Sequence, residues 1–231
     1  MSATCWGLLL VKPAAVKHCF VTGGELSRTS LEILLLTNPI SPMLAGWGLM
    51  VLAMMLPKLI IPIQYTCERS FKNRRFRAAS LFVLGYMGVW MVVGALMIGG
   101  ILGLTLFMPG SYTPAIVVGI IAAIWQFSPV KQQCLNRGHN HKALAAFGRA
   151  ADYDSVLFGF EHAVWCVGSN WVLMLFPVLL PGGNNFVMLA VTLLMLSEHM
   201  EAPRTPRWRI NLSSKLIRIL FAQTSIRLAR S

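Results

Sequence analysis

Hydrophobic residues in this chain gather in five long blocks, and short polar or basic segments separate the blocks. A helix that crosses a bilayer needs roughly 20 mostly apolar residues in succession. The pattern therefore predicts an all-α membrane protein, built as a bundle of about five transmembrane helices. The predicted spans cover residues 43–65, 78–107, 112–128, 155–180 and 185–200.

These blocks divide the chain into three parts. Residues 43–201 form the predicted transmembrane bundle. Residues 1–42 are interpreted as an external N-terminal segment, because their longest apolar run is too short to span and prolines interrupt it. Residues 202–231 form a basic tail in which leucines and basic residues alternate with a helical period. This pattern favours an amphipathic helix on the inner leaflet, with packing against loops or a partner as the alternative.

Composition and charge agree with a membrane protein. The chain is 56% hydrophobic and only 12% charged, which reverses the balance of a soluble domain. Its net charge of +12 does not indicate nucleic-acid binding, because most basic residues lie in three blocks beside the hydrophobic spans, at 69–77, 131–149 and 204–230. By the positive-inside rule these blocks are cytoplasmic, so we expect the N-terminus outside and the C-terminus inside. This charge pattern suits a bacterial inner membrane and an organellar one alike, and we expect the bacterial inner membrane.

Five ionisable residues fall inside the predicted spans, where each costs several kcal/mol unless it is paired. They are Lys58, Glu161, His162, Glu198 and His199. The predicted topology places all five in the cytoplasmic half of the bundle. They can therefore form a shared site, or a structural network that includes an ion pair between Lys58 and Glu198.

Soft metal ligands occur at helical spacing on two spans. His162 and Cys166 are four residues apart and share a helix face, as do Met50 and Met54. Imidazole, thiol and thioether groups together favour copper over zinc. We predict a metal site of Met50, Met54, His162 and Cys166, with Glu161 supporting His162. The alternative is ordinary packing, because methionine commonly fills hydrophobic cores.

Signatures of catalysis are absent from the sequence. It contains no H-E-x-x-H, no G-x-S-x-G and no glycine-rich phosphate loop before a lysine. The five cysteines are widely spaced and form no C-x-x-C pair, so a disulfide framework is not expected. The sequence thus predicts a protein that is not an enzyme.

Three segments give the chain a resemblance to a known family. They are WGLMVLAMMLP at 47–57, QFSPVKQQCL at 126–135 and CVGSNWVLM at 166–174. In this order and spacing they resemble the motifs of the bacterial predicted metal-binding integral membrane proteins, a family of unknown function. The resemblance covers roughly residues 43–201 and implies a helical bundle that handles metal, with copper trafficking favoured.

The chain also departs from that family's pattern. Ser169 and Asn170 stand where the family has a cysteine pair, and a second cysteine expected after Cys134 and Leu135 is missing. This member therefore either binds metal through the four predicted ligands alone or retains the scaffold without the metal.

In the second case it would be a non-catalytic accessory or scaffold subunit without a cofactor. Such a subunit would contact other membrane subunits through its basic tail and its glycine-rich second span, where Gly99 and Gly103 form a small-xxx-small pair. A small-ion or metabolite carrier is a third alternative, which the absence of an internal repeat disfavours.

Overall fold

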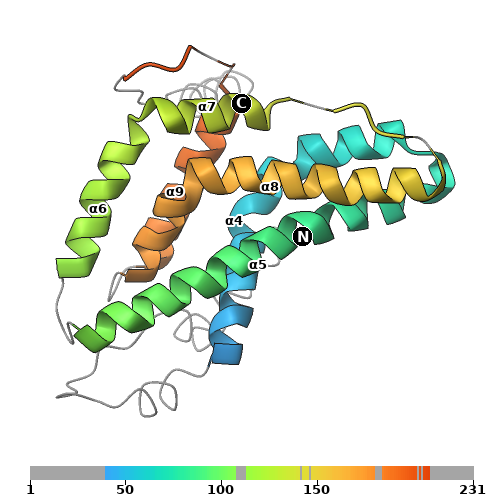
Figure 1. The fold of residues 1–231 in the computed structure, drawn as a ribbon. Coiled ribbons are helices and arrows are strands. Elements are labelled where there is room, and N and C mark those ends of the chain that lie inside the picture. Colours follow the sequence, from blue (N-terminus) through green and yellow to red (C-terminus); the bar gives the residue numbers. More distant parts are fainter. Residues whose placement is uncertain are drawn as a thin grey trace, which may run out of the picture.

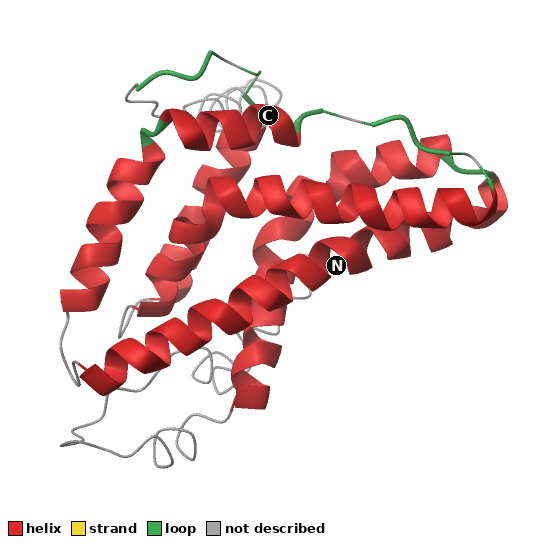
Figure 2. Ribbon diagram, in the orientation of Figure 1, coloured by secondary structure: helices red, strands yellow, loops and turns green. Residues whose placement is uncertain are grey.

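The described part of the protein is entirely helical. The computed structural model describes residues 40–107, 113–140, 142–145, 147–179, 184–201, 203 and 205–208. Its helices are α4 (Ile40–Arg69), the short 3₁₀ helix η1 (Lys72–Arg74), α5 (Arg75–Phe107), α6 (Thr113–Gln126), α7 (Pro129–Gly138), α8 (Gly148–Leu179) and α9 (Asn184–His199) (Figures 1 and 2). No strand occurs within these ranges, so the predicted all-α class is confirmed there.

Three of the helices are long and apolar enough to cross a membrane, judged by length and composition. They are α4, α5 and α8, with 30, 33 and 32 residues. Helices α6 and α9 are apolar but have only 14 and 16 residues, which is short for a span that needs roughly 20. The structure therefore supports three candidate spans and does not support the predicted count of five or its orientation.

Several predicted boundaries differ from the observed ones. Helix α4 begins at Ile40, inside the predicted external segment. The first basic block, residues 69–77, is largely helical, because it contains the end of α4, η1 and the start of α5. Helix α8 begins at Gly148, so Asp152 lies inside it instead of before it. At that place Asp152 forms ion pairs with Arg74 at 2.6 Å and with Arg77 at 2.7 Å. Residues 1–39 and 209–231, including the predicted tail helix, lie outside the described residues.

Helix α4 runs through the core and changes direction along its length (Figure 1). Pro57 and Pro62 lie inside it, and an internal proline removes a backbone hydrogen bond and bends a helix. Near its start, the Trp47 indole donates to the backbone carbonyl of Trp90 at 3.0 Å. A Cβ added at Gly94 would lie only 2.1 Å from the Trp47 indole nitrogen, so the ring occupies the space that a side chain would need. The glycine thus lets α5 approach α4.

Helices α5 and α8 touch through their backbones. A Cβ added at Gly85 would lie 2.4 Å from the Val156 carbonyl oxygen, and one at Gly159 would lie 2.1 Å from that of Phe82. Each glycine thus makes room for the other helix. The predicted close packing of the second span occurs here and at Gly94, whereas a Cβ at Gly99 or Gly103 would meet no described atom within 4 Å.

Helix α7 occupies much of the first half of the second basic block, for which the hydrophobic pattern predicts no helix. The Ser128 side chain accepts a hydrogen bond from the Val130 amide at 3.2 Å, and Pro129 occupies the first turn. Both residues are typical of a helix start. Helix α7 lies across the ends of α6 and α9 in Figure 1 and packs against α8. It therefore brings Lys131 and Cys134 toward the core.

Candidate metal centre

The thiol of Cys166 lies in the core at the meeting point of three helices. Its residue is 7% exposed. The hydroxyl of Tyr86, from α5, donates to the Cys166 sulfur at 3.1 Å, and the thioether sulfur of Met55, from α4, lies 3.9 Å from it. The Cys166 sulfur thus contacts one hydrogen-bond donor and one further sulfur atom, both from other helices.

The predicted methionines lie on the same helix as Met55. Met50 and Met54 are both 1% exposed, and Met55 is fully buried. Because α4 is buried on nearly every side over this stretch, helical spacing alone could not identify the methionine that contacts Cys166. The contact with Met55 is an addition to the predicted set, and ligation by Met50 and Met54 stays a prediction.

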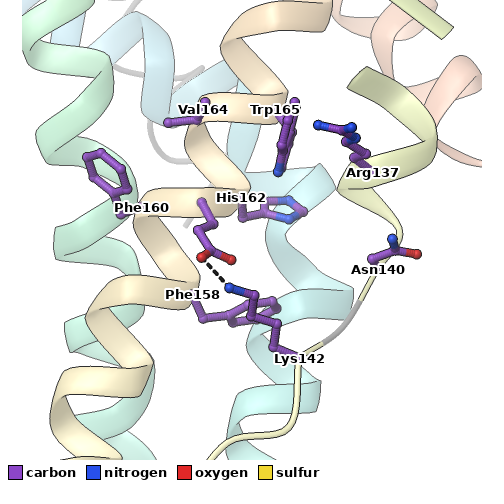
Figure 3. Close-up of a pocket in the computed structure, with 9 residues that line it drawn as sticks. Arg137, Asn140, Lys142, Phe158, Phe160, His162, Val164 and Trp165 are labelled. Atoms are coloured by element: carbon purple, nitrogen blue, oxygen red, sulfur yellow. Dashed lines mark hydrogen bonds and ion pairs between the residues drawn. The ribbon is translucent and has the colours of Figure 1, made fainter. Parts of the chain in front are cut away.

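His162 lies one helical turn before Cys166 on α8, among aromatic rings. Its ring centroid lies 6.1 Å from those of Phe82 and Tyr86 and 6.2 Å from that of Phe158. It also lines a pocket of about 410 Å³ that opens between α8 and the segment after α7 (Figure 3). The predicted pair of His162 and Cys166 therefore shares a buried helix face, as the sequence indicates.

Glu161 also lines the pocket of about 410 Å³. Its carboxylate forms an ion pair with Lys142, and the two side chains are 31% and 58% exposed. A pair this exposed contributes little to stability. The predicted supporting role of Glu161 toward a metal ligand stays a prediction.

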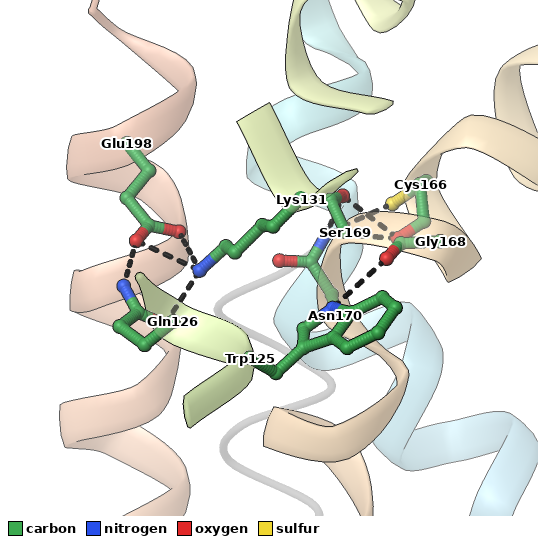
Figure 4. A network of polar contacts seen from close by, with 8 residues as sticks. All are labelled: Trp125, Gln126, Lys131, Cys166, Gly168, Ser169, Asn170 and Glu198. Atoms are coloured by element: carbon green, nitrogen blue, oxygen red, sulfur yellow. Dashed lines mark hydrogen bonds and ion pairs between the residues drawn. The ribbon is translucent and has the colours of Figure 1, made fainter. Parts of the chain in front are cut away.

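Ser169 and Asn170 enclose Cys166 with hydrogen bonds (Figure 4). The Ser169 hydroxyl donates to the Cys166 carbonyl at 2.9 Å. The Asn170 amide donates to that carbonyl at 3.0 Å and to the Cys166 sulfur at 3.5 Å. The side-chain oxygen of Asn170, Oδ1, is buried and has no hydrogen-bond partner among the described residues. Ser169 and Asn170 thus bind the backbone carbonyl of Cys166, and Asn170 also contacts its sulfur.

A buried ion pair joins α7 to α9 (Figure 4). The Lys131 ammonium lies 2.8 Å from the Glu198 carboxylate and 2.5 Å from the Gln126 side-chain oxygen, and Gln126 also donates to Glu198. The two charged side chains are 2% and 9% exposed. Glu198 therefore pairs with Lys131 and not with Lys58. The correction arises because Lys131, which the sequence places in a basic block between spans, lies on a helix packed against the core.

The environment of α7 shifts the acidities of two of its side chains. Burial lowers the pKa of Lys131, Glu198 opposes this shift, and the positive charge of Lys58 adds to it. Burial raises the pKa of the Cys134 thiol, and the nearby Arg137 guanidinium partly opposes that shift. Charges in this region therefore interact across α4, α7 and α9.

A second, smaller pocket lies between these helices. Its volume is about 20 Å³, close to what one water molecule or ion needs. Residues from four helices line it, namely Lys58, Cys134, Leu135, Gly138, His162, Trp165, Cys166, Ser169 and His199. The rings of His199 and His139 stack with centroids 5.1 Å apart at its edge. Three of the five predicted embedded ionisable residues (Lys58, His162 and His199) therefore meet at one place.

The arrangement suits a soft ion of low coordination number. No three histidine, cysteine, aspartate or glutamate side chains in the described ranges are grouped to hold a metal ion. A metal–sulfur bond of about 2.3 Å, the zinc–thiolate value, lets two sulfurs share one ion at up to about 4.6 Å. The separation of 3.9 Å between the sulfurs of Cys166 and Met55 meets that condition. Thiolates suit both Cu(I) and zinc, and the thioether favours Cu(I), because zinc sites use cysteine, histidine and carboxylate ligands.

Comparison with known proteins identifies the family. No curated protein and no solved structure matches the chain. The sequence profile of the family described as "PpoB2: Copper chaperone" matches residues 44–220. That description points to copper handling and to a non-catalytic role, in agreement with the metal handling that the three motifs imply. The match covers most of the chain, which therefore belongs to the PpoB2 copper chaperone family.

Proposed function

We propose that this protein is an integral membrane protein that binds Cu(I) inside its helical bundle and holds it for transfer. The observation that carries the proposal is the buried contact between the Cys166 thiol and the Met55 thioether, 3.9 Å apart. His162, one turn away, is a further candidate ligand. Met50 and Met54 remain candidates on α4, and copper is favoured over zinc because one of the donors is a thioether, which zinc sites do not use.

Surface composition supports the membrane location. Large apolar side chains project outward from α5, α6 and α9, including Leu96 at 72% exposure, Ile116 at 61% and Phe186 at 82%. Charged residues such as Lys58 and Lys131 are instead buried. An apolar exterior, with charged side chains turned into the bundle, is expected in lipid, where extensive exposed apolar surface has no cost. We propose a bacterial inner membrane, about five spans and an inner C-terminus.

Copper loading tests the site directly. Purified protein loaded with Cu(I) under anaerobic conditions is expected to retain about one ion per chain, measured by elemental analysis. Cys166→Ser and Met55→Leu are both expected to lower this ratio, because each removes a sulfur while nearly conserving volume. Cys67→Ser and Met195→Leu are matched controls, since these residues lie on the α4 terminus and in α9 and are expected to leave the ratio unchanged. Wild-type protein without retained copper would refute the proposal.

An accessory subunit is the second candidate, and the outer face of α5 favours it. A Cβ added at Gly88, Gly99, Gly100 or Gly103 would meet no described atom within 4 Å, so the bundle itself does not use these glycines for packing. Small residues on a lipid-facing helix allow close approach by another helix. Gly99→Leu is expected to release any constant partner that co-purifies in mild detergent, and purification without such a partner would exclude this role.

A further inference from the structure

Lys58 is a lysine in the core that pairs with no acidic side chain among the described residues. It is 4% exposed and lines the pocket of about 20 Å³. Within the described ranges no side chain forms an ion pair or hydrogen bond with it, and the buried carboxylate of Glu198 pairs with Lys131. A buried charge without a partner is strongly unfavourable. The pocket therefore has the electrostatics of a site for a negatively charged occupant.

Two thiols line the same pocket from opposite helices. Cys166 comes from α8 and Cys134 from α7. The Cys134 sulfur lies 2.7 Å from the position that a Cβ on Gly168 would take. The absence of a side chain at Gly168 thus lets the Cys134 thiol approach the backbone of α8 two residues beyond Cys166.

The spacing on α4 points Lys58 toward these thiols. Residues three apart on a helix share a face, and Met55, three residues before Lys58, contacts Cys166 at 3.9 Å. Helix α7 repeats this arrangement with Lys131 and Cys134, which are also three residues apart. Lys58 from α4 and Cys134 from α7 both line the pocket, whereas Lys131 is held by Glu198.

From this convergence we infer that Cys134 and Cys166 bind Cu(I) as a pair of thiolates and that Lys58 supplies the charge that neutralises the complex. The inference rests on the proposed function. Each thiol loses one proton on binding, so one Cu⁺ and two thiolates form a complex with one negative charge. The ammonium of Lys58 balances that charge, and the protons leave to solvent. Met55 lies close enough to Cys166 to add a third sulfur.

Affinity for Cu(I) tests this role in the full-length protein. It is measured in detergent under anaerobic reducing conditions, by competition with the chromophoric chelator bicinchoninate. Lys58→Met is expected to weaken Cu(I) binding at least about tenfold, because the anionic complex loses its buried counter-charge. Lys58→Arg keeps the charge and is expected to stay within about threefold of wild type. Lys72→Met, at an exposed lysine of η1, is the matched control and is expected to change nothing.

Thermal unfolding of the copper-free protein separates this role from a structural one. Lys58→Met removes an unbalanced buried charge, so its unfolding midpoint is expected to rise although its copper affinity falls. A lysine needed for folding would instead lower the midpoint when replaced. Lys58→Gln gives a second test if the methionine variant does not fold.

X-ray absorption at the copper edge tests the second thiolate. Cys134→Ser is expected to reduce the number of sulfur neighbours of the bound copper by one and to weaken binding as Lys58→Met does. Unchanged affinity in Lys58→Met, or an unchanged sulfur count in Cys134→Ser, would overturn the inference while leaving the proposed function intact. Wild-type protein that binds no Cu(I) would instead refute the proposed function.

Discussion

Replacing Lys131 with methionine is expected to destabilise the protein by about 3–5 kcal/mol, because it leaves the Glu198 carboxylate buried without its cation. The two side chains are 2% and 9% exposed, and the ammonium lies 2.8 Å from the carboxylate. Gln126 would remain as a hydrogen-bond donor to Glu198 but carries no charge. The midpoint of thermal unfolding in detergent micelles measures the loss.

A double variant distinguishes a lost ion pair from lost packing. Lys131→Met combined with Glu198→Leu removes both charges and is expected to recover most of the stability, since an apolar replacement of a buried pair is often neutral or favourable. Arg77→Ala is the control for an exposed pair. Its side chain is 67% exposed and Asp152 keeps Arg74, so we expect a change below about 1 kcal/mol. A double variant no more stable than Lys131→Met would contradict the assignment.

Gly85→Ala is expected to separate α5 from α8 and to lower stability by about 1–3 kcal/mol, the usual cost of overpacking. The new Cβ would lie 2.4 Å from the Val156 carbonyl oxygen. A backbone atom cannot rotate away as a side chain can, so the helices themselves must shift. The same measurement of thermal unfolding reports the change.

Gly88→Ala is the matched control on the same helix, three residues later. A Cβ there would meet no described atom within 4 Å. Alanine favours helix over glycine by about 1 kcal/mol, so this variant is expected to be as stable as wild type or more stable. A loss of stability in Gly85→Ala together with no loss in Gly88→Ala would establish the close contact between α5 and α8. Equal effects would show that helix propensity, and not contact between helices, dominates at both positions.

Hydrophobic patterning predicted the helical class and the approximate positions of the long helices, because each apolar block exceeds what a soluble helix requires. It also placed a break at Ser128 and Pro129. Those residues proved to start α7 as well as to end α6, since the serine caps the new helix. Local propensity cannot show whether a chain stops or turns at such a position. That depends on what the next segment packs against.

The candidate site was predictable only in part for the same reason. The spacing of His162 and Cys166 correctly indicated one buried face of α8. The contact with Met55 could not be deduced, because Pro57 and Pro62 bend α4 and its methionines are buried on every side. Lys131 was missed as a buried charge because it lies in a basic block. Its partner, Glu198, is 67 residues away in sequence, beyond any local pattern.

The paired glycines of α5 and α8 have a consequence for conformational change. Backbone atoms meet at Gly85 and Gly159, without side chains between them to change rotamer as the helices slide. A shear motion is a small sliding of packed helices, and direct contact between the two backbones opposes such sliding. Helices α5 and α8 should therefore move together as one rigid frame, and any opening that releases a bound ion must come from displacement of α4, α7 or α9 relative to that frame.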